Sequence, residues 1–180
     1  GANQTVCAGT SVTLSGTGAT SYVWNNGITN ATAFTPVATQ TYTVTGTNAN
    51  GCVNTAQVQV SVNALPTVSA GANQTVCAGT SVTLSGTGAT SYVWNNGITN
   101  ATAFTPVATQ NYTVTGTDAN GCVNTAQVQV SVNALPIVIA GANQTVCAGT
   151  SVTLSGTGAT SYVWNNGITN ATAFTPVATQ

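Results

Sequence analysis

Five cysteines and one aspartate are the side chains of this chain from which chemistry could be expected. They are Cys7, Cys52, Cys77, Cys122, Cys147 and Asp118. A thiol can form a disulfide, bind a metal ion, or act as a nucleophile when a neighbouring base activates it. The sequence contains no His, Lys, Arg or Glu that could act as that base or complete a metal site. We therefore expect no catalytic, cofactor-binding or metal-binding residue, which leaves disulfide formation.

The near absence of charged side chains also bears on partners. Charged residues make up 1% of the chain, against about 25% in an ordinary globular protein. Nucleic acids and anionic membranes are bound largely through Lys and Arg, so the sequence excludes both as partners. The longest apolar run, residues 134–142, is interrupted by Pro136 and Gly141, and we expect no membrane-inserted helix. The expected partners are neighbouring modules and other copies of the chain, with a glycan or surface ligand as a further candidate.

The cysteines recur with a sequence repeat of 70 residues, since the segment that begins at Gly1 returns unchanged at Gly71 and Gly141. Such a period indicates a tandem array of similar units. Residues 1–70 and 71–140 differ at four positions, which are Thr41/Asn111, Asn48/Asp118, Thr67/Ile137 and Ser69/Ile139. The sequence starts without an initiator Met or signal peptide and stops within a repeat. We therefore expect an internal excerpt of a longer, secreted protein.

Each repeat must position its cysteines with short β-strands. Apolar residues alternate with Thr, Ser, Gln and Asn, which is typical of strands with one buried face. Clusters of Asn and Gly, such as residues 48–51, predict tight turns between them. The predicted core of the first repeat is Val12, Leu14, Tyr22, Trp24, Phe34, Tyr42, Val44, Val58 and Val60, and the run 56–62 adds Ala56 and Val62. About seven strands in each repeat predict an all-β fold of tandem immunoglobulin-like β-sandwich modules.

The joints between modules are predicted at the two Ala-Leu-Pro segments, which end at Pro66 and Pro136. Proline cannot donate a ladder hydrogen bond, so it marks the limit of a central strand. The resulting modules are 1–65, which lacks its first strand, 66–135, which is complete, and 136–180, which is truncated.

Three stretches of the complete module carry a resemblance to known repeats. They are residues 70–84, which include Cys77-Ala78-Gly79, then Tyr92-Val93-Trp94, then residues 112–122, which end in Asp118-Ala119-Asn120-Gly121-Cys122. They resemble the PKD-like and immunoglobulin-like repeats of giant surface proteins and adhesins of gliding bacteria. The resemblance implies display outside the cell, adhesion or filament formation, and it brings no catalytic residues.

Two cysteine pairings are compatible with a secreted chain that has two cysteines in each module. Nearness in sequence suggests Cys7–Cys52 and Cys77–Cys122, within modules. In a sandwich, however, Cys77 follows the first strand and Cys122 follows the last hairpin, at opposite poles. A six-residue strand separates the poles by roughly 20 Å, whereas a disulfide needs Cα atoms within about 7 Å. We favour a bond across the joint, Cys7–Cys122, and keep the within-module pairing as the alternative.

Two functions follow as hypotheses. The first is a structural repeat region of an extracellular or cell-surface filament or adhesin stalk, which suits the identity of residues 1–40, 71–110 and 141–180. The alternative is an adhesin whose repeats bind glycan, ice or a solid surface through Thr-rich β-faces. Such a face would consist of Thr41, Thr43, Thr45 and Thr47, which alternate along one strand with a spacing of about 6.7 Å.

Several smaller features have a structural and a functional interpretation. Asn3, Asn30, Asn73 and Asn100 match the N-glycosylation sequon, although such matches arise easily in a chain rich in Asn and Thr. One carboxylate in a module is few for calcium, so Asp118 is interpreted as a turn residue. The pair Tyr22 and Trp24 could stack on a sugar, but at the centre of a strand we expect it to belong to the core.

Overall fold

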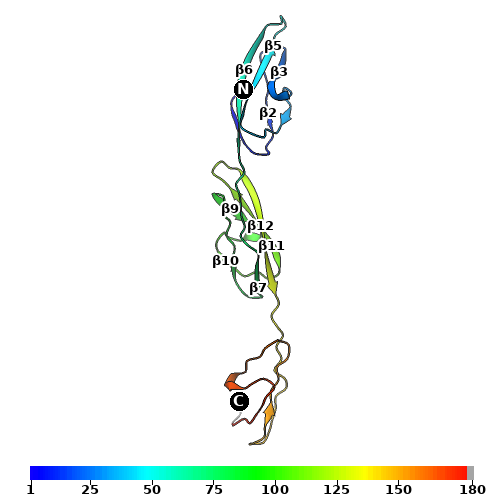
Figure 1. Cartoon of the computed structure of the whole chain (residues 1–180), viewed down its shortest axis with the longest axis vertical. Helices are drawn as coiled ribbons and strands as arrows, with labels where there is room; N and C mark the ends of the chain where they lie inside the picture. Colours follow the sequence, from blue (N-terminus) through cyan, green and yellow to red (C-terminus); the bar gives the residue numbers. More distant parts are fainter. Residues whose placement is uncertain (178–180) are drawn as a thin grey trace.

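The computed structural model describes residues 1–177, and within them regular structure consists of β-strands and single 3₁₀ turns. The three units of the repeat follow one another along the long axis of the molecule, with the N-terminus in the first unit and the C-terminus in the last (Figure 1). The last three residues of the third predicted module, 178–180, lie outside the described residues.

The second unit contains one four-stranded and one two-stranded sheet. The larger sheet has the order β7-β12-β11-β9, and the smaller pairs β8 with β10. The strands are β7 (Gln74–Cys77), β8 (Val82–Thr83), β9 (Ser91–Trp94), β10 (Ala103–Phe104), β11 (Gln110–Thr117) and β12 (Val123–Asn133). The first strand, β7, runs parallel to the last, β12, and the other pairs are antiparallel.

The first unit repeats this arrangement with the order β1-β6-β5-β3 and the pair β2-β4. Its strands are β1 (Gln4–Cys7), β2 (Val12–Thr13), β3 (Ser21–Trp24), β4 (Ala33–Phe34), β5 (Gln40–Thr47) and β6 (Val53–Asn63). In the described part of the third unit, β13 (Val152–Thr153) pairs with β14 (Ala173–Phe174). The sequence reaches Gln180, the counterpart of Gln110 with which β11 begins.

The 3₁₀ turns η1 (Asn25–Gly27), η2 (Asn95–Gly97) and η3 (Asn165–Gly167) follow the same Trp in each unit. The middle Asn of each turn has a φ between 56° and 59°. Asn tolerates this left-handed conformation better than most residues. The Asn-Asn-Gly cluster therefore ends the strand at Trp24 and at Trp94 and turns the chain toward the opposite sheet.

The two sheets of the second unit enclose a core in which Leu84 is 1% exposed. Trp94 of β9 and Tyr112 near the start of β11 are buried in it. A buried Trp on the third strand and a Tyr at the start of the strand before the last are hallmarks of immunoglobulin domains. Val114 stands two residues after Tyr112, where antibody domains carry a cysteine of their inter-sheet disulfide. The modules are thus tandem immunoglobulin-like β-sandwiches in which no cysteine stands at the position of the antibody inter-sheet disulfide.

Most of the predicted core residues of the first unit are buried. They are Val12, Leu14, Trp24, Tyr42, Val44, Val58 and Val60. Tyr22 and Phe34 are partly buried and pack against this core, and Phe34 meets Tyr42 edge to face with ring centroids 5.2 Å apart. The prediction was wrong for Ala56, which is exposed, and Val62 is half-buried. Alternation along β6 gives the side of the strand correctly, but nothing covers Ala56 at this end of the sheet.

The prediction of about seven strands also needs correction, because six form in each of the first two units. Residues 66–70, at the start of the complete module, form no strand and make a single bridge between Ser69 and Thr87. Pro66 has no N–H to donate, and no second pair of residues continues the ladder. The segment nevertheless lies against the sandwich, where it forms part of the joint between the first two modules.

Candidate functional site

The linker between the first two modules is held against the second module. It leaves β6 after Asn63, and Pro66 is buried although Ala64 and Leu65 are exposed. The side-chain amide of Asn124, at the start of β12, donates a hydrogen bond to the carbonyl oxygen of Pro66 at 3.0 Å. The peptide connection between modules therefore ends on the β11–β12 hairpin of the second module.

Residues 67–70 continue along the second module and pack against two of its glycines, Gly88 and Gly116. The N–H groups of Ser69 and Thr87 each donate to the other's carbonyl oxygen at 3.0 Å. Val68 lies over Gly116, where an added Cβ would come within 2.6 Å of its Cγ2. At Gly88, whose φ is +88°, a Cβ would overlap the carbonyl oxygen of Thr67. A side chain at either glycine would lift the segment off the module.

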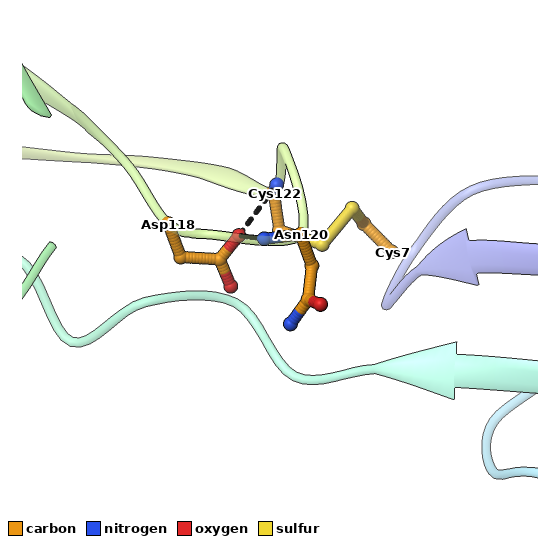
Figure 2. The surroundings of a disulfide bond; sticks show 4 residues. All are labelled: Cys7, Asp118, Asn120 and Cys122. Atoms are coloured by element: carbon orange, nitrogen blue, oxygen red, sulfur yellow. Dashed lines mark hydrogen bonds between the residues drawn. A yellow bond between two sulfur atoms is a disulfide. The ribbon is translucent and has the colours of Figure 1, made fainter. Parts of the chain in front are cut away.

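A disulfide joins Cys7 of the first module to Cys122 of the second, with Cα atoms 5.5 Å apart. Cys122 is 0% exposed. The Oδ1 atom of Asp118 accepts hydrogen bonds from the backbone N–H groups of Asn120 and Cys122, both at 2.8 Å (Figure 2). The N–H of Asp118 in turn donates to the carbonyl oxygen of Cys122 at 3.0 Å. The carboxylate thus fixes the turn that presents Cys122 to the neighbouring module.

Cys7 is presented from the other side of the joint by the parallel pair β1–β6. It lies opposite Asn63 in the ladder, and the N–H of Ala8 donates to the carbonyl oxygen of Asn63 at 2.8 Å. Asn63 is also the residue after which the linker begins. The linker and the disulfide therefore leave the same end of the first module side by side, and two covalent connections cross the joint.

The remaining three cysteines, Cys52, Cys77 and Cys147, are exposed and free. The within-module pairs Cys7–Cys52 and Cys77–Cys122 are not formed. The bonded cysteines are 115 residues apart in sequence, and no two of the free cysteines have that separation. Within residues 1–177, no disulfide crosses the second joint, between modules two and three.

The predicted sequon residues take part in structure. The Oδ1 atom of Asn30 accepts from the N–H of Gly16 at 2.7 Å and from the indole Nε1 of Trp24 at 3.0 Å. Asn100 makes the same two bonds in the second module. Asn3 and Asn73 accept from backbone N–H groups of β6 and β12. A buried indole N–H needs an acceptor, so the Asn six residues after each Trp could have been assigned this role from the sequence.

Most of the Thr row and of the aromatic pair Tyr22–Trp24 is at least partly buried. Thr43, Thr45 and Thr47 are half-buried, and only Thr41 of the row is exposed. The side chain of Gln57 donates to Oγ1 of Thr43 at 3.3 Å. The hydroxyl of Tyr22 hydrogen-bonds both the N–H and the carbonyl oxygen of Ala19, and its neighbour Trp24 is buried. These contacts tie the Thr row and the Tyr22–Trp24 pair into the module.

The sequence did not indicate the roles of Gly88, Gly116 and Asn124 in the joint. A glycine inside a strand often marks the close approach of another backbone, and Gly116 within β11 is such a case. In residues 1–177, no three His, Cys, Asp or Glu side chains gather where they could hold a metal ion. No helix in this described part is long and apolar enough to cross a membrane.

No protein-family model matches the chain, and no curated protein matches it. Among solved structures it is similar to the N-terminal eight immunoglobulin domains of Down syndrome cell adhesion molecule, with a TM-score of 0.39 and 20% identity over 86% of this chain and 30% of that one. For the insect immune protein hemolin the TM-score is 0.38, with 18% identity over 74% and 45% of the two chains.

Domains 1–4 of sidekick-1 give a TM-score of 0.33 and 16% identity over 87% of this chain and 57% of that one. The chain spans less than half the length of the first two proteins. Its assignment to the immunoglobulin-like fold rests on its own strand order, on the parallel pair β7–β12 and on the buried Trp94 and Tyr112.

Proposed function

We propose that this chain is a structural repeat region of an extracellular filament or adhesin stalk, in which the modules give length and the joints give stiffness. The disulfide Cys7–Cys122, which runs beside the linker, is the observation that carries this proposal. A single short linker lets two modules pivot about one point. A second covalent connection next to it, together with the seated segment 66–70, restricts that pivot.

The chemistry of the chain supports the same proposal. Disulfides persist in oxidising compartments, which supports a location outside the cell or on its surface. The chain offers no base for catalysis, which supports a non-enzymatic role. The resemblance to PKD-like repeats of gliding bacteria belongs to this proposal, as do the module boundaries 1–65, 66–135 and 136–180. The partners proposed are neighbouring modules and other copies of the chain.

The two joints of one molecule provide the test. Single particles imaged by electron microscopy under oxidising conditions give the distribution of angles between modules one and two and between modules two and three. We expect a narrow distribution at the first joint and a broad one at the second. The double variant Cys7→Ser, Cys122→Ser should broaden the first joint, while the control Cys147→Ser should not. Equal distributions at the two joints of the unmodified chain would contradict the proposal.

A further inference from the structure

The single charged side chain of the sequence stands beside the disulfide that crosses the first joint. The sequence has one Asp or Glu, which is Asp118, and no Lys, Arg or His. The Oδ1 atom of Asp118 accepts from the backbone N–H of Cys122 at 2.8 Å, and Cys122 is bonded to Cys7 (Figure 2). Bond lengths then place the sulfur of Cys122 within about 7 Å of this oxygen. Salt screens charges only beyond about 10 Å at 0.1 M, so the carboxylate acts on the disulfide directly.

The turn that presents Cys122 does not require this charge. In the first module, Asn48 stands at the position of Asp118 and accepts from the N–H groups of Asn50 and Cys52 at 2.9 and 3.0 Å. The N–H of Asn48 donates to the carbonyl oxygen of Cys52 at 3.0 Å, as that of Asp118 does to Cys122. An uncharged amide therefore forms the same turn. The charge of Asp118 is an additional property, and the reactive group next to it is the disulfide.

The two halves of the disulfide differ in their access to a reagent. Cys122 is 0% exposed, whereas Cys7 is half-buried. A disulfide is reduced by a thiolate, which attacks one sulfur and expels the other as a thiolate. The attack therefore falls on Cys7, and Cys122 is the group that leaves with a negative charge. That charge develops in a buried position beside the carboxylate of Asp118, where little water is present to screen it.

Reduction by a small thiol takes two steps. In the first, the thiolate sulfur bonds to Sγ of Cys7, the S–S bond breaks, and its electron pair goes to the sulfur of Cys122, which takes a proton from water. In the second, another thiolate attacks the reagent's sulfur in the mixed disulfide and releases Cys7, which is protonated in turn. Two thiols are thereby oxidised to one small disulfide, and Cys7 and Cys122 each end as a thiol.

We propose that Asp118 protects the joint disulfide from reduction by small anionic thiols. Its carboxylate repels the incoming anion and destabilises the negative charge on the leaving sulfur of Cys122, and both effects slow the first step. The repulsion depends on the charge of the reagent, so the joint discriminates against anionic thiols in favour of cationic ones. The role of this protection rests on the proposed function, because the bond that it preserves is the one that stiffens the joint.

The test measures how fast two probe thiols reduce this disulfide in the whole 180-residue chain. The exposed thiols of Cys52, Cys77 and Cys147 are replaced by Ser, so that they cannot exchange with the bond. The probes are glutathione, which is anionic, and cysteamine, which is cationic, at one pH and with each rate divided by the thiolate fraction of the reagent. Acid stops the reaction, the released thiols are alkylated, and mass spectrometry counts and locates them.

The variant Asp118→Asn removes the charge and keeps the acceptor of the turn. Reduction by glutathione should accelerate at least about threefold, which is the effect of one unit charge at about 7 Å in water. Reduction by cysteamine should accelerate less, because its ammonium group loses an attraction to the carboxylate. At about 1 M salt, where the screening length is about 3 Å, the difference between the two thiols should nearly disappear.

The matched control is Asn48→Asp, which places the same charge in the same turn of the first module. The disulfide does not involve that turn, whose cysteine is Cys52. Both reduction rates should therefore stay as they are when Asp118 is kept. In the unmodified turn, the first mixed disulfide should form on Cys7, since Cys122 is the buried half of the bond.

Equal reduction rates with and without the Asp118→Asn change overturn the proposal. An acceleration that is the same for both thiols and independent of salt also overturns it, because a loosened turn would then be the cause. None of these rates depends on the angles between modules. A rigid first joint with no effect of Asp118→Asn would leave the stalk proposal standing and remove only the protection. A flexible joint with the expected rates would do the reverse.

Discussion

The first and second joints of this chain have nearly the same linker and very different surroundings. Pro66 and Ala70 are buried at the first joint, whereas Pro136 and Ala140 are exposed at the second. The linker residues that face the module are the same in both. The difference lies in the β11–β12 hairpin of the second module, which has no counterpart in the described part of the third unit.

The comparison shows that the joint is built by the module that follows and not by the linker alone. The hairpin region supplies Gly116 beneath Val68, Asn124 for the carbonyl of Pro66, and Cys122 for the disulfide. Each of these can be removed singly.

The largest effect is expected from the disulfide. In the chain-entropy model, a cross-link that closes a loop of about 100 residues stabilises the folded state by about 4 to 5 kcal/mol. The double variant Cys7→Ser, Cys122→Ser should lose about that much stability in urea unfolding of the first two modules. Cys147→Ser removes an exposed thiol and should leave the midpoint where it was. An unchanged midpoint for the double variant would show that the disulfide adds nothing to the joint.

The two glycines at Gly18 and Gly88 form a matched pair that tests the seat of the linker. Both have a φ near +88°, so alanine at either costs about 1 to 2 kcal/mol of backbone strain. At Gly88 the new methyl also overlaps the carbonyl of Thr67, which adds about 1 to 3 kcal/mol. Gly88→Ala should therefore destabilise its module more than Gly18→Ala does, as measured by differential scanning calorimetry. If the two variants lost the same stability, the segment 66–70 would be able to move away from the new methyl group at no energetic cost.

A smaller difference is expected between Asn124→Ala and Asn54→Ala. In both modules the Asn accepts a hydrogen bond from the N–H of the following Thr. Only Asn124 also donates to the linker, at the carbonyl of Pro66. Such a bond contributes about 1 kcal/mol, so Asn124→Ala should cost about that much more than Asn54→Ala. Hydrogen exchange of the N–H of Ser69, which donates to Thr87, should accelerate in the first variant and stay unchanged in the second.

The sequence predicts the fold of the modules better than their joints. The 70-residue period and the alternation along strands such as β6 predict tandem immunoglobulin-like sandwiches, and the structure confirms that fold class. The argument that Cys77 and Cys122 lie at opposite poles needs only strand length. It favoured the pair Cys7–Cys122, which the structure contains.

The contacts of the linker do not follow from local pattern. The alternation of apolar and polar residues along β6 predicts the face of the sheet on which Ala56 lies. It does not predict that no other residue covers Ala56. The role of Gly88 depends on Thr67, which is near in space because the chain turns back over the module. A positive φ at Gly88 could be expected from a turn, whereas the carbonyl lying against it could not.

The smallest effect is expected at Asp118, the one charged residue. Its variants distinguish the contribution of the turn from the contribution of the joint. Asp118 accepts from the N–H groups of Asn120 and Cys122 at 2.8 Å, and Asn48 accepts from Asn50 and Cys52 at 2.9 and 3.0 Å. The amide already makes both bonds in the first module, so Asp118→Asn should keep the turn and lose only the charge-assisted part, under about 1 kcal/mol. Asp118→Ala removes the acceptor and leaves two N–H groups beside the disulfide without it, which should cost more. Thermal unfolding of both variants measures the difference. If Asp118→Asn were as damaging as Asp118→Ala, the carboxylate charge itself, and not the turn that it shares with Asn48, would hold Cys122 in position.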